Sequence, residues 1–316
     1  MNDDVNDTAA ISGGGAPVFL FRADSAEVVP RNVAHIRIHP SVTIIPDGAF
    51  KFCNRLRVVE LPEGLKVIGS QAFYGCMALS NINFPSTLKR IGDRAFHRCR
   101  KLVDVTLPEG LQEICHEAFE ECTHLISINV PSTVKVIGYK AFYKCMSLVD
   151  VELHEGLEEV RDAVFHGCRK LVEVNLPQGL RGLGKNAFKE CESLARIKVP
   201  PTVKVISNSA FVNCHGLEVV ELSEGVQEIR ERAFLDCISL KSINLPNSVR
   251  KISNLSFGDC IQLTEIDLPH SLEVSSSISH GTLPSSYVDV LFSLLLLPSF
   301  RICSRVHSED ASFSTS

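Results

Sequence analysis

A period of twenty-three residues runs through most of this sequence and constrains its fold more than any other feature. A cysteine stands three residues after each phenylalanine of the repeat, from Cys53 to Cys260, and a leucine follows three residues later, from Leu56 to Leu263. A fixed period of this length is typical of a solenoid, in which each repeat is one unit of a stack. The phenylalanines recur without insertion or deletion at Phe50, Phe73, Phe96, Phe119, Phe142, Phe165, Phe188, Phe211, Phe234 and Phe257.

Each repeat continues with an alternating pattern that predicts a β-strand. The residues after the leucine follow L-x-x-[VI]-x-[LFV], usually with a proline next, as in LVDVTLPEGL at residues 102–111. Alternating β-branched residues that end in proline and glycine are typical of a short strand and its turn. A second apolar pair follows, Leu111 and Ile114 in that repeat.

The segment that carries the phenylalanine predicts one or two helical turns, because Ala118, Phe119 and Cys122 have helical i, i+3 and i+4 spacing. One repeat cannot fold alone. About seven buried apolar side chains contribute on the order of 10 to 20 kcal/mol, whereas ordering the unit costs about 35 kcal/mol. The repeats must therefore stack.

The repeat L-x-x-I-x-L-P-x-x-L-x-x-I-x-x-x-A-F-x-x-C-x-x-L resembles the BspA-like class of leucine-rich repeats, from about Ile36 to Leu272. The resemblance implies an α/β repeat fold, a curved solenoid with a parallel β-sheet on its concave face and short helices opposite. It also implies a surface for protein interaction or adhesion. We expect residues 34–272 to form about ten repeats and residues 1–33 to form an N-terminal tail or cap.

Residues 273–316 keep neither the phenylalanine nor the cysteine of the repeat, and we expect an irregular C-terminal tail. Their apolar run, residues 288–297, contains Asp289 and Ser293 and is shorter than the roughly 20 residues needed to cross a bilayer. A cap, a partner-docking helix, or residues foreign to the natural product would each fit. We favour disorder or the last interpretation.

Composition bounds the partners and the compartment. The net charge of -5 and pI of about 6.1 give no cationic footprint, so we expect neither a nucleic-acid nor a membrane partner. The first residues lack the basic and apolar regions of a secretory signal. Twelve cysteines without such a signal favour a reducing compartment. We therefore expect a cytoplasmic monomer.

The ten repeat cysteines predict a buried ladder of small apolar side chains. Their spacing differs from that of zinc sites, and no histidine recurs in register with them. Side chains of a ladder point the same way, whereas a disulfide needs two Cβ atoms turned toward each other. We expect free thiols that fill space beside the phenylalanine rings, and neither a metal nor a cofactor.

Cys115 lies outside the ladder and precedes His116, so a Cys–His nucleophile is a weak hypothesis. Neighbouring residues on a short turn rarely aim at one another, and no third group is specified to orient them. Phosphate-loop, hydrolase and metalloprotease motifs are absent from the sequence. We expect a protein that is not an enzyme and has no catalytic residue.

The strand residues that point outward form the candidate binding surface on the concave sheet. Acids outnumber bases in these positions, which favours a partner protein with a basic segment. An acidic face that serves only solubility is the competing interpretation. The central residues of this surface, which we call the polar strip, are Asp104, Thr106, Ser127, Asn129, Asp150, Glu152, Glu173, Asn175, Arg196 and Lys198.

A second charged feature lies in the segment LKRIGDRAFHRCRK, which Arg55, Arg57 and Lys66 could extend. A basic patch there could bind an acidic or phosphate-bearing partner, although a solvated face is commoner. The primary hypothesis is a non-enzymatic scaffold that binds another protein, and the alternative is adhesion to glycans or host proteins. The basic residues of this segment are Lys89, Arg90, Arg94, Arg98, Arg100 and Lys101.

Overall fold

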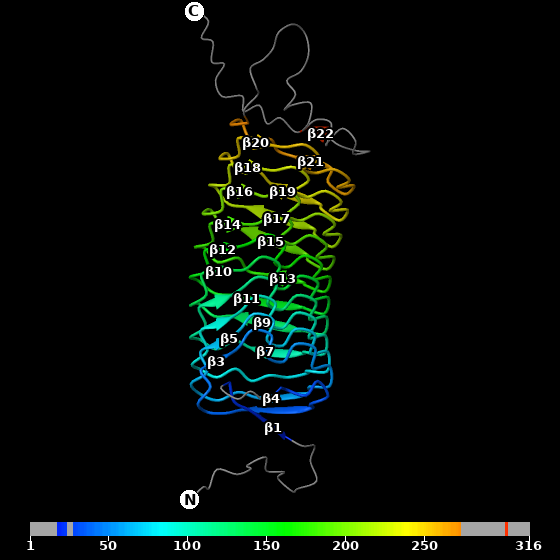
Figure 1. Cartoon of the computed structure of the whole chain (residues 1–316). Coiled ribbons are helices and arrows are strands. Elements are labelled where there is room, and N and C mark those ends of the chain that lie inside the picture. Colours follow the sequence, from blue (N-terminus) through cyan, green and yellow to red (C-terminus); the bar gives the residue numbers. More distant parts are fainter. Residues whose placement is uncertain (1–17, 24–27, 273–300, 303–316) are drawn as a thin grey trace, which may run out of the picture.

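Each twenty-three-residue repeat forms one coil, and the coils lie on one another in a continuous column (Figure 1). The computed structural model describes residues 18–23, 28–272 and 301–302. Three walls enclose the column, and each wall is built from one part of the repeat. The apolar side chains of every coil point into the space between the walls and form one core.

The first wall is a set of parallel strands that we call the long-strand face. It holds the alternating segment that the sequence predicted as a strand, and most of its strands are followed within three residues by a proline, which has no amide for the ladder. Its strands are β1 (Val18–Phe21), β2 (His35–Ile38), β4 (Val58–Glu60), β7 (Asp104–Thr106), β9 (Ser127–Val130), β11 (Asp150–Leu153), β13 (Glu173–Val174), β15 (Arg196–Val199), β17 (Val219–Leu222), β19 (Ser242–Asn244) and β21 (Glu265–Ile266).

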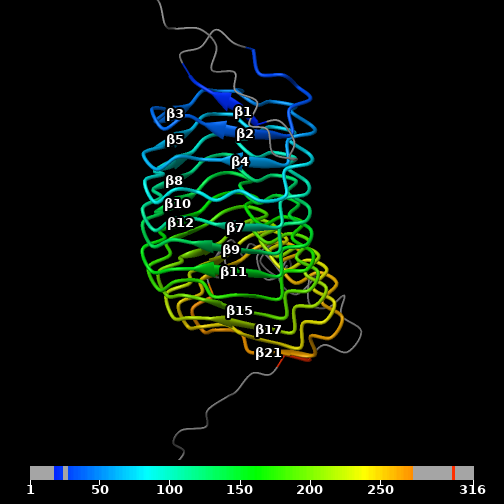
Figure 2. The same cartoon turned by 90° about the horizontal axis from the view of Figure 1, so that it is seen from below.

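The second wall is a set of two-residue parallel strands, which contain the apolar residue represented by Ile114. Figure 2 shows the labels of the two walls along adjacent sides of the column. The strands are β3 (Ile44–Ile45), β5 (Val67–Ile68), β6 (Arg90–Ile91), β8 (Glu113–Ile114), β10 (Val136–Ile137), β12 (Glu159–Val160), β14 (Gly182–Leu183), β16 (Val205–Ile206), β18 (Glu228–Ile229) and β20 (Lys251–Ile252).

The third wall, which we call the turn wall, consists of the stacked segments with the phenylalanine and cysteine, such as residues 138–147. The prediction of short helices here is wrong, because the described residues contain no helix. Lys140 and Lys144 have φ angles of 55° and 57°, in the left-handed region that an α-helix excludes. Equivalent positive angles recur on both sides of the phenylalanine in the other coils.

Hydrogen bonding explains why the turn replaces a helix. The amides of Ala141 and Tyr143 bond to carbonyls three residues earlier in the same coil. The amide of Phe142 donates instead to the Val164 carbonyl of the next coil, at 3.0 Å. Alternate amides thus join neighbouring coils, whereas a helix would use all of them internally. The i, i+3, i+4 spacing that predicted a helix arises from successive turns, each of which is closed by a hydrogen bond between residues three apart.

The core is a stack of identical side chains. The rings of Phe119, Phe142 and Phe165 lie 5.5 and 5.7 Å apart between centroids, with interplanar angles of 6° and 4°. All ten repeat phenylalanines are fully buried. Beside each ring lies the buried cysteine of the same coil. This confirms that the repeating apolar side chains cover one another in a stack.

Both strand walls are interrupted at the same level of the column. Pairing stops after β13 in the long-strand face and after β14 in the second wall, and it resumes with β15 and β16. The turn wall continues across this level, since the amides of Asn186 and Phe188 donate to Asn208 and Ala210 of the next coil. The turn wall therefore keeps its regular coil-to-coil bonds at this level, where the strand walls keep only isolated backbone bonds such as that from Ala195 to Val172.

The ends add two short strands. β1 lies inside residues 1–33 and pairs in parallel with β2, so it extends the stack beyond the first repeat. β22 (Arg301–Ile302) pairs with β21. The predictions for residues 273–300 and 303–316, and for residues 1–17 and 24–27, lie outside the described residues. Within the described part of the chain, no helix has the length and apolar character to cross a membrane.

Candidate functional site

The long-strand face exposes the polar strip as the sequence predicted. All ten residues of the strip have solvent-exposed side chains, and they alternate with buried residues such as Val151 and Ile197. Parallel pairing places Asp150 between Ser127 and Glu173 of the neighbouring strands. Residues twenty-three apart in the chain thus become direct neighbours on the surface.

The electrostatic state of the strip follows from these neighbours. Asp150 and Glu173 are like charges on paired strands, which disfavours their close approach unless a cation joins them. Lys198 lies 4.0 Å from Glu221, and both side chains are exposed. The only other side-chain bond to the strip among the described residues joins Asn129 to His154, at 2.8 Å. The acids of the strip are therefore accessible to a partner.

An exposed apolar column borders the strip, and the sequence analysis missed it. Ile126, Val149 and Val172 are 46%, 40% and 47% exposed, and the half-buried Val103 and Ala195 extend the column at its ends. Each of these residues directly precedes the first strip residue of its coil. Amide-to-carbonyl bonds join successive members of the column, for example Val149 to Ile126 at 2.8 Å. We call these five residues the apolar column.

A signal for the apolar column was present in the sequence. Among the ten repeats, the position directly after the repeat leucine is apolar only in these five consecutive repeats and is polar in the other five. This position, read down the stack together with the outward-pointing positions of the polar strip, indicates the apolar column. The apolar column spans the same five coils as the polar strip.

The predicted basic patch is neutralised by acids of the following coil. Arg98 and Arg100 donate to Glu121 at 3.2 and 3.1 Å, and Arg90 lies 2.9 Å from Glu113. The twenty-three-residue register creates this pairing, because a basic repeat is followed by an acidic one. Lys101 has no ion pair within the described residues.

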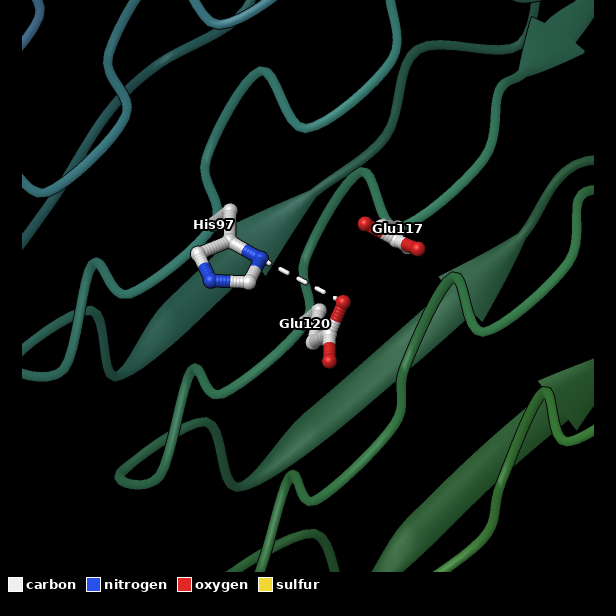
Figure 3. Close-up of side chains that lie close together, drawn as sticks. All are labelled: His97, Glu117 and Glu120. Carbon is white, nitrogen blue, oxygen red and sulfur yellow. Dashed lines mark ion pairs between the residues drawn. The ribbon is translucent and has the colours of Figure 1, made fainter.

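A histidine and two acids form a separate cluster on the turn wall, shown in Figure 3. His97 and Glu120 occupy the same position in consecutive coils, and only 7% and 8% of their surface is exposed. His97 Nδ1 lies 3.3 Å from Glu120 Oε2. Glu117 is two residues before Phe119, and its carboxylate accepts a hydrogen bond from Arg94. The prediction of no metal rested on the cysteines and did not consider this cluster.

The structure does not join Cys115 to His116. The His116 ring nitrogen Nε2 lies 3.4 Å from Arg161, two coils further on, while the Cys115 thiol contacts Arg90 at 3.3 Å. Burial raises the pKa of Cys115, and the bond from Arg90 only partly offsets this effect. A nucleophilic thiol needs a lowered pKa. The arrangement gives no support to a Cys–His nucleophile.

The ladder cysteines are free and buried, as predicted, but they are more than apolar filling. The thiol of Cys145 donates to the carbonyl of Phe119, in the preceding coil, at 3.3 Å. The same bond recurs from Cys76 to Cys260, at 3.1 to 3.3 Å. Burial raises the pKa of Cys145 far above that of an exposed thiol. These cysteines are neutral structural donors.

Comparison with known proteins agrees with the coil geometry. The family described as "BspA type Leucine rich repeat region" matches the chain in six copies, over residues 30–149 and 135–264. No curated protein matches the sequence.

Two solved structures are similar to most of the chain. A leucine-rich repeat protein from Bacteroides ovatus is 29% identical, with a TM-score of 0.53; the match covers 77% of this chain and 74% of that one. A leucine rich cell surface protein from Faecalibacterium prausnitzii is 25% identical, with a TM-score of 0.50 and coverage of 82% and 76%.

Proposed function

The chain belongs to the BspA-type leucine-rich repeat family, and from this premise we propose that it is a non-enzymatic scaffold that binds another protein. Binding takes place on the long-strand face, which we take as the concave side. The partner supplies an apolar row with basic residues beside it.

The observation that carries the proposal is the apolar column beside the polar strip. Three aliphatic side chains that are each 40% or more exposed lie in register on consecutive coils. Isolated surface hydrophobes are ordinary, whereas a continuous row marks a surface that gains from being covered. The adjoining Asp150, Glu152 and Glu173 supply the charge that selects and orients a basic partner.

The spacing of the column favours a helical partner segment. Neighbouring coils are about 4.8 Å apart, and one turn of an α-helix rises about 5.4 Å. Residues i and i+2 of a β-strand are about 6.7 Å apart, so a strand loses register after one or two coils. The five residues of the apolar column span about 19 Å, which matches about 13 residues of helix.

A synthetic amphipathic peptide of leucine and lysine residues tests this surface. We expect the triple variant Ile126→Ser, Val149→Ser, Val172→Ser to weaken peptide binding at least tenfold in fluorescence anisotropy. The matched control changes two exposed apolar residues of the turn wall, Ile238→Ser and Ile261→Ser, and should change affinity less than twofold.

A second triple variant, Asp150→Ser, Glu152→Ser, Glu173→Ser, separates charge from apolar contact. We expect weaker binding and a smaller loss of affinity as salt is raised, because fewer ion pairs are screened. Binding that is equal in both triple variants and the wild type would refute the proposed surface. The same variants can then be used to compare proteins captured from the native source.

A second candidate function is adhesion or recognition at a cell surface, of glycans or host proteins. The observation in its favour is the similarity to the F. prausnitzii protein, which is described as a cell surface protein. Protease treatment of intact native cells separates the two candidates. Cleavage of the protein on intact cells supports adhesion, whereas protection until lysis supports the cytoplasmic scaffold.

A further inference from the structure

One coil of the turn wall is acidic and lies between two basic coils. Glu117, Glu120 and Glu121 belong to this coil, and the preceding coil places Arg94 beside Glu117 and Arg98 beside Glu121. Glu117 and Glu121 each have an arginine partner. Glu120 instead faces the ring of His97, which belongs to the preceding coil. The most buried carboxylate of the three, that of Glu120, therefore faces an imidazole and not an arginine.

The Nδ1 atom of His97 lacks the hydrogen bond that its burial requires. Nδ1 has no accessible surface and no hydrogen bond, and no other buried side-chain nitrogen or oxygen in the described residues is in this state. A buried polar atom without a partner costs about 1–3 kcal/mol. Such an atom in a native protein requires an explanation, and a bound ion is one of those that buried polar atoms have.

The separation of Nδ1 from Glu120 Oε2 fits two ligands of one ion better than a hydrogen bond. Hydrogen bonds from nitrogen to oxygen usually measure about 2.7–3.2 Å, and this pair is 3.3 Å apart. Ligands at about 2.0–2.1 Å from a tetrahedral zinc ion lie about 3.3 Å from each other. One ligand atom each from His97, Glu117 and Glu120 fall within 4.8 Å of one another.

We propose that His97, Glu117 and Glu120 bind a divalent transition-metal ion of the zinc class on the turn wall. One imidazole and two carboxylates suit this class of ion. Three protein ligands leave one tetrahedral position for water. The ion lies between two coils and links His97 of one coil to Glu117 and Glu120 of the next.

The ring of His97 is held in the orientation that metal binding needs. It stacks on Tyr74 of the preceding coil, with 4.7 Å between ring centroids and an interplanar angle of 4°. Figure 3 shows Nδ1 facing Glu120, with the Glu117 carboxylate beside them. Because the ring is fixed before a ligand arrives, little side-chain entropy is lost on binding.

The chain contains a matched control for this site. His166 occupies the same repeat position three coils later, and its Nε2 lies 3.4 Å from Glu190. The described residues place no second carboxylate there, since the metal-competent grouping contains only His97, Glu117 and Glu120. Both sites therefore contain a histidine–glutamate pair, and only the site at His97 has a second carboxylate as the third ligand.

Arg94 supplies a second, opposite test. Its guanidinium is bonded to the Glu117 carboxylate and competes with a cation for the charge of this ligand. The variant Arg94→Gln should therefore bind metal more tightly, by about threefold or more. A cluster whose only role is structural would show no such gain.

The experiment titrates the full chain with zinc chloride in an isothermal calorimeter after chelator treatment. A Cys115→Ser background removes the half-buried thiol that could compete. We expect one equivalent to bind, at least tenfold more weakly in Glu120→Gln and His97→Asn and unchanged in His166→Asn. Thermal unfolding with and without zinc checks that each variant is folded.

Glu117→Gln keeps the test decisive if a change at the buried His97 or Glu120 prevents folding, because Glu117 is less buried. We expect its affinity to fall at least fivefold. The proposal is overturned by the absence of stoichiometric binding, by unchanged affinity in Glu120→Gln or Glu117→Gln, or by loss of binding on the Cys115→Ser change alone.

Discussion

The turn wall and the long-strand face use the same twenty-three-residue repeat in opposite ways. The turn wall keeps the same two buried residues in every coil, and its coil-to-coil hydrogen bonds continue through the described repeats. The long-strand face is divided into separate sheets, and its outward side chains change from coil to coil. The uniform contacts of the turn wall hold the coils together. The outward side chains of the long-strand face can therefore vary without disrupting the stack.

This difference separates stability from recognition. A ring such as Phe142 is packed by identical rings on both sides, so a change there affects two coil interfaces. An exposed side chain such as Ile126 contacts solvent and can vary at little cost. We expect changes in the turn wall to alter unfolding, and changes in the long-strand face to alter binding.

The largest expected effect is unfolding at alkaline pH, which acts through the buried thiols of the turn wall. Burial raises the pKa of its thiols, for Cys214 to about 12. Unfolded thiols ionise near pH 8.5. Because the folded pKa is the higher one, this contribution to stability is complete below about pH 8.5 and declines as the pH rises toward the folded value.

The size of the alkaline effect comes from repetition. Each such thiol reduces the free energy of unfolding by about 1.4 kcal/mol per pH unit, and the eight thiols whose pKa is raised most by burial together reduce it by on the order of 10 kcal/mol per unit. Urea unfolding followed by circular dichroism, under reducing conditions, should show collapse of the transition between about pH 9 and 10.5. Cys168→Ala removes one of these thiols and should reduce the loss of unfolding free energy per pH unit by the contribution of one thiol. A transition independent of pH to about pH 10 would contradict the ladder.

The second effect is the loss of one ring from the stack. Phe142→Ala should lower the free energy of unfolding by about 3–5 kcal/mol, through lost burial and the cavity left between two neighbouring rings. Ile126→Ala on the long-strand face should change it by less than about 0.5 kcal/mol. Urea titration of both variants measures the contrast. Similar values for the two would remove the distinction between the walls.

The third effect concerns a partly buried ion pair on the turn wall. Glu121→Gln removes the negative charge of the acceptor shared by Arg98 and Arg100, and the Glu121 side chain is only 21% exposed. Charge-assisted hydrogen bonds of this kind contribute about 1–2 kcal/mol. We expect a loss in that range, measured by thermal unfolding at low salt. A neutral result would mean that solvent screens this pair completely.

The smallest effect concerns an ion pair on the long-strand face. Lys198→Gln removes the partner of Glu221, and both side chains are more than 60% exposed. Exposed pairs contribute about 0–1 kcal/mol, and we expect less than about 0.5 kcal/mol here. Thermal unfolding of this variant beside Glu121→Gln compares the walls directly. A larger loss from Lys198→Gln would reverse the ranking.

The sequence by itself determined which side chains are buried and how they recur. The fixed period requires Phe142 and Cys145 to lie at the same depth as their equivalents, and alternation around Val151 requires Asp150 and Glu152 to face outward. These features are local, because each depends on spacing within one repeat. The solenoid and the exposure of the polar strip were therefore predictable.

The tertiary structure alone decided where the backbone bonds of each coil go and which charges meet. The amide of Phe142 could have joined a helix, but it bonds to Val164, twenty-two residues away. His97 and Glu120 lie one repeat apart, so the period places them on neighbouring coils, but only the stacked coils show that Nδ1 lies 3.3 Å from Oε2 and that Glu117 joins the same cluster. Contacts between coils form at the stacking distance, and local sequence patterns do not specify their geometry.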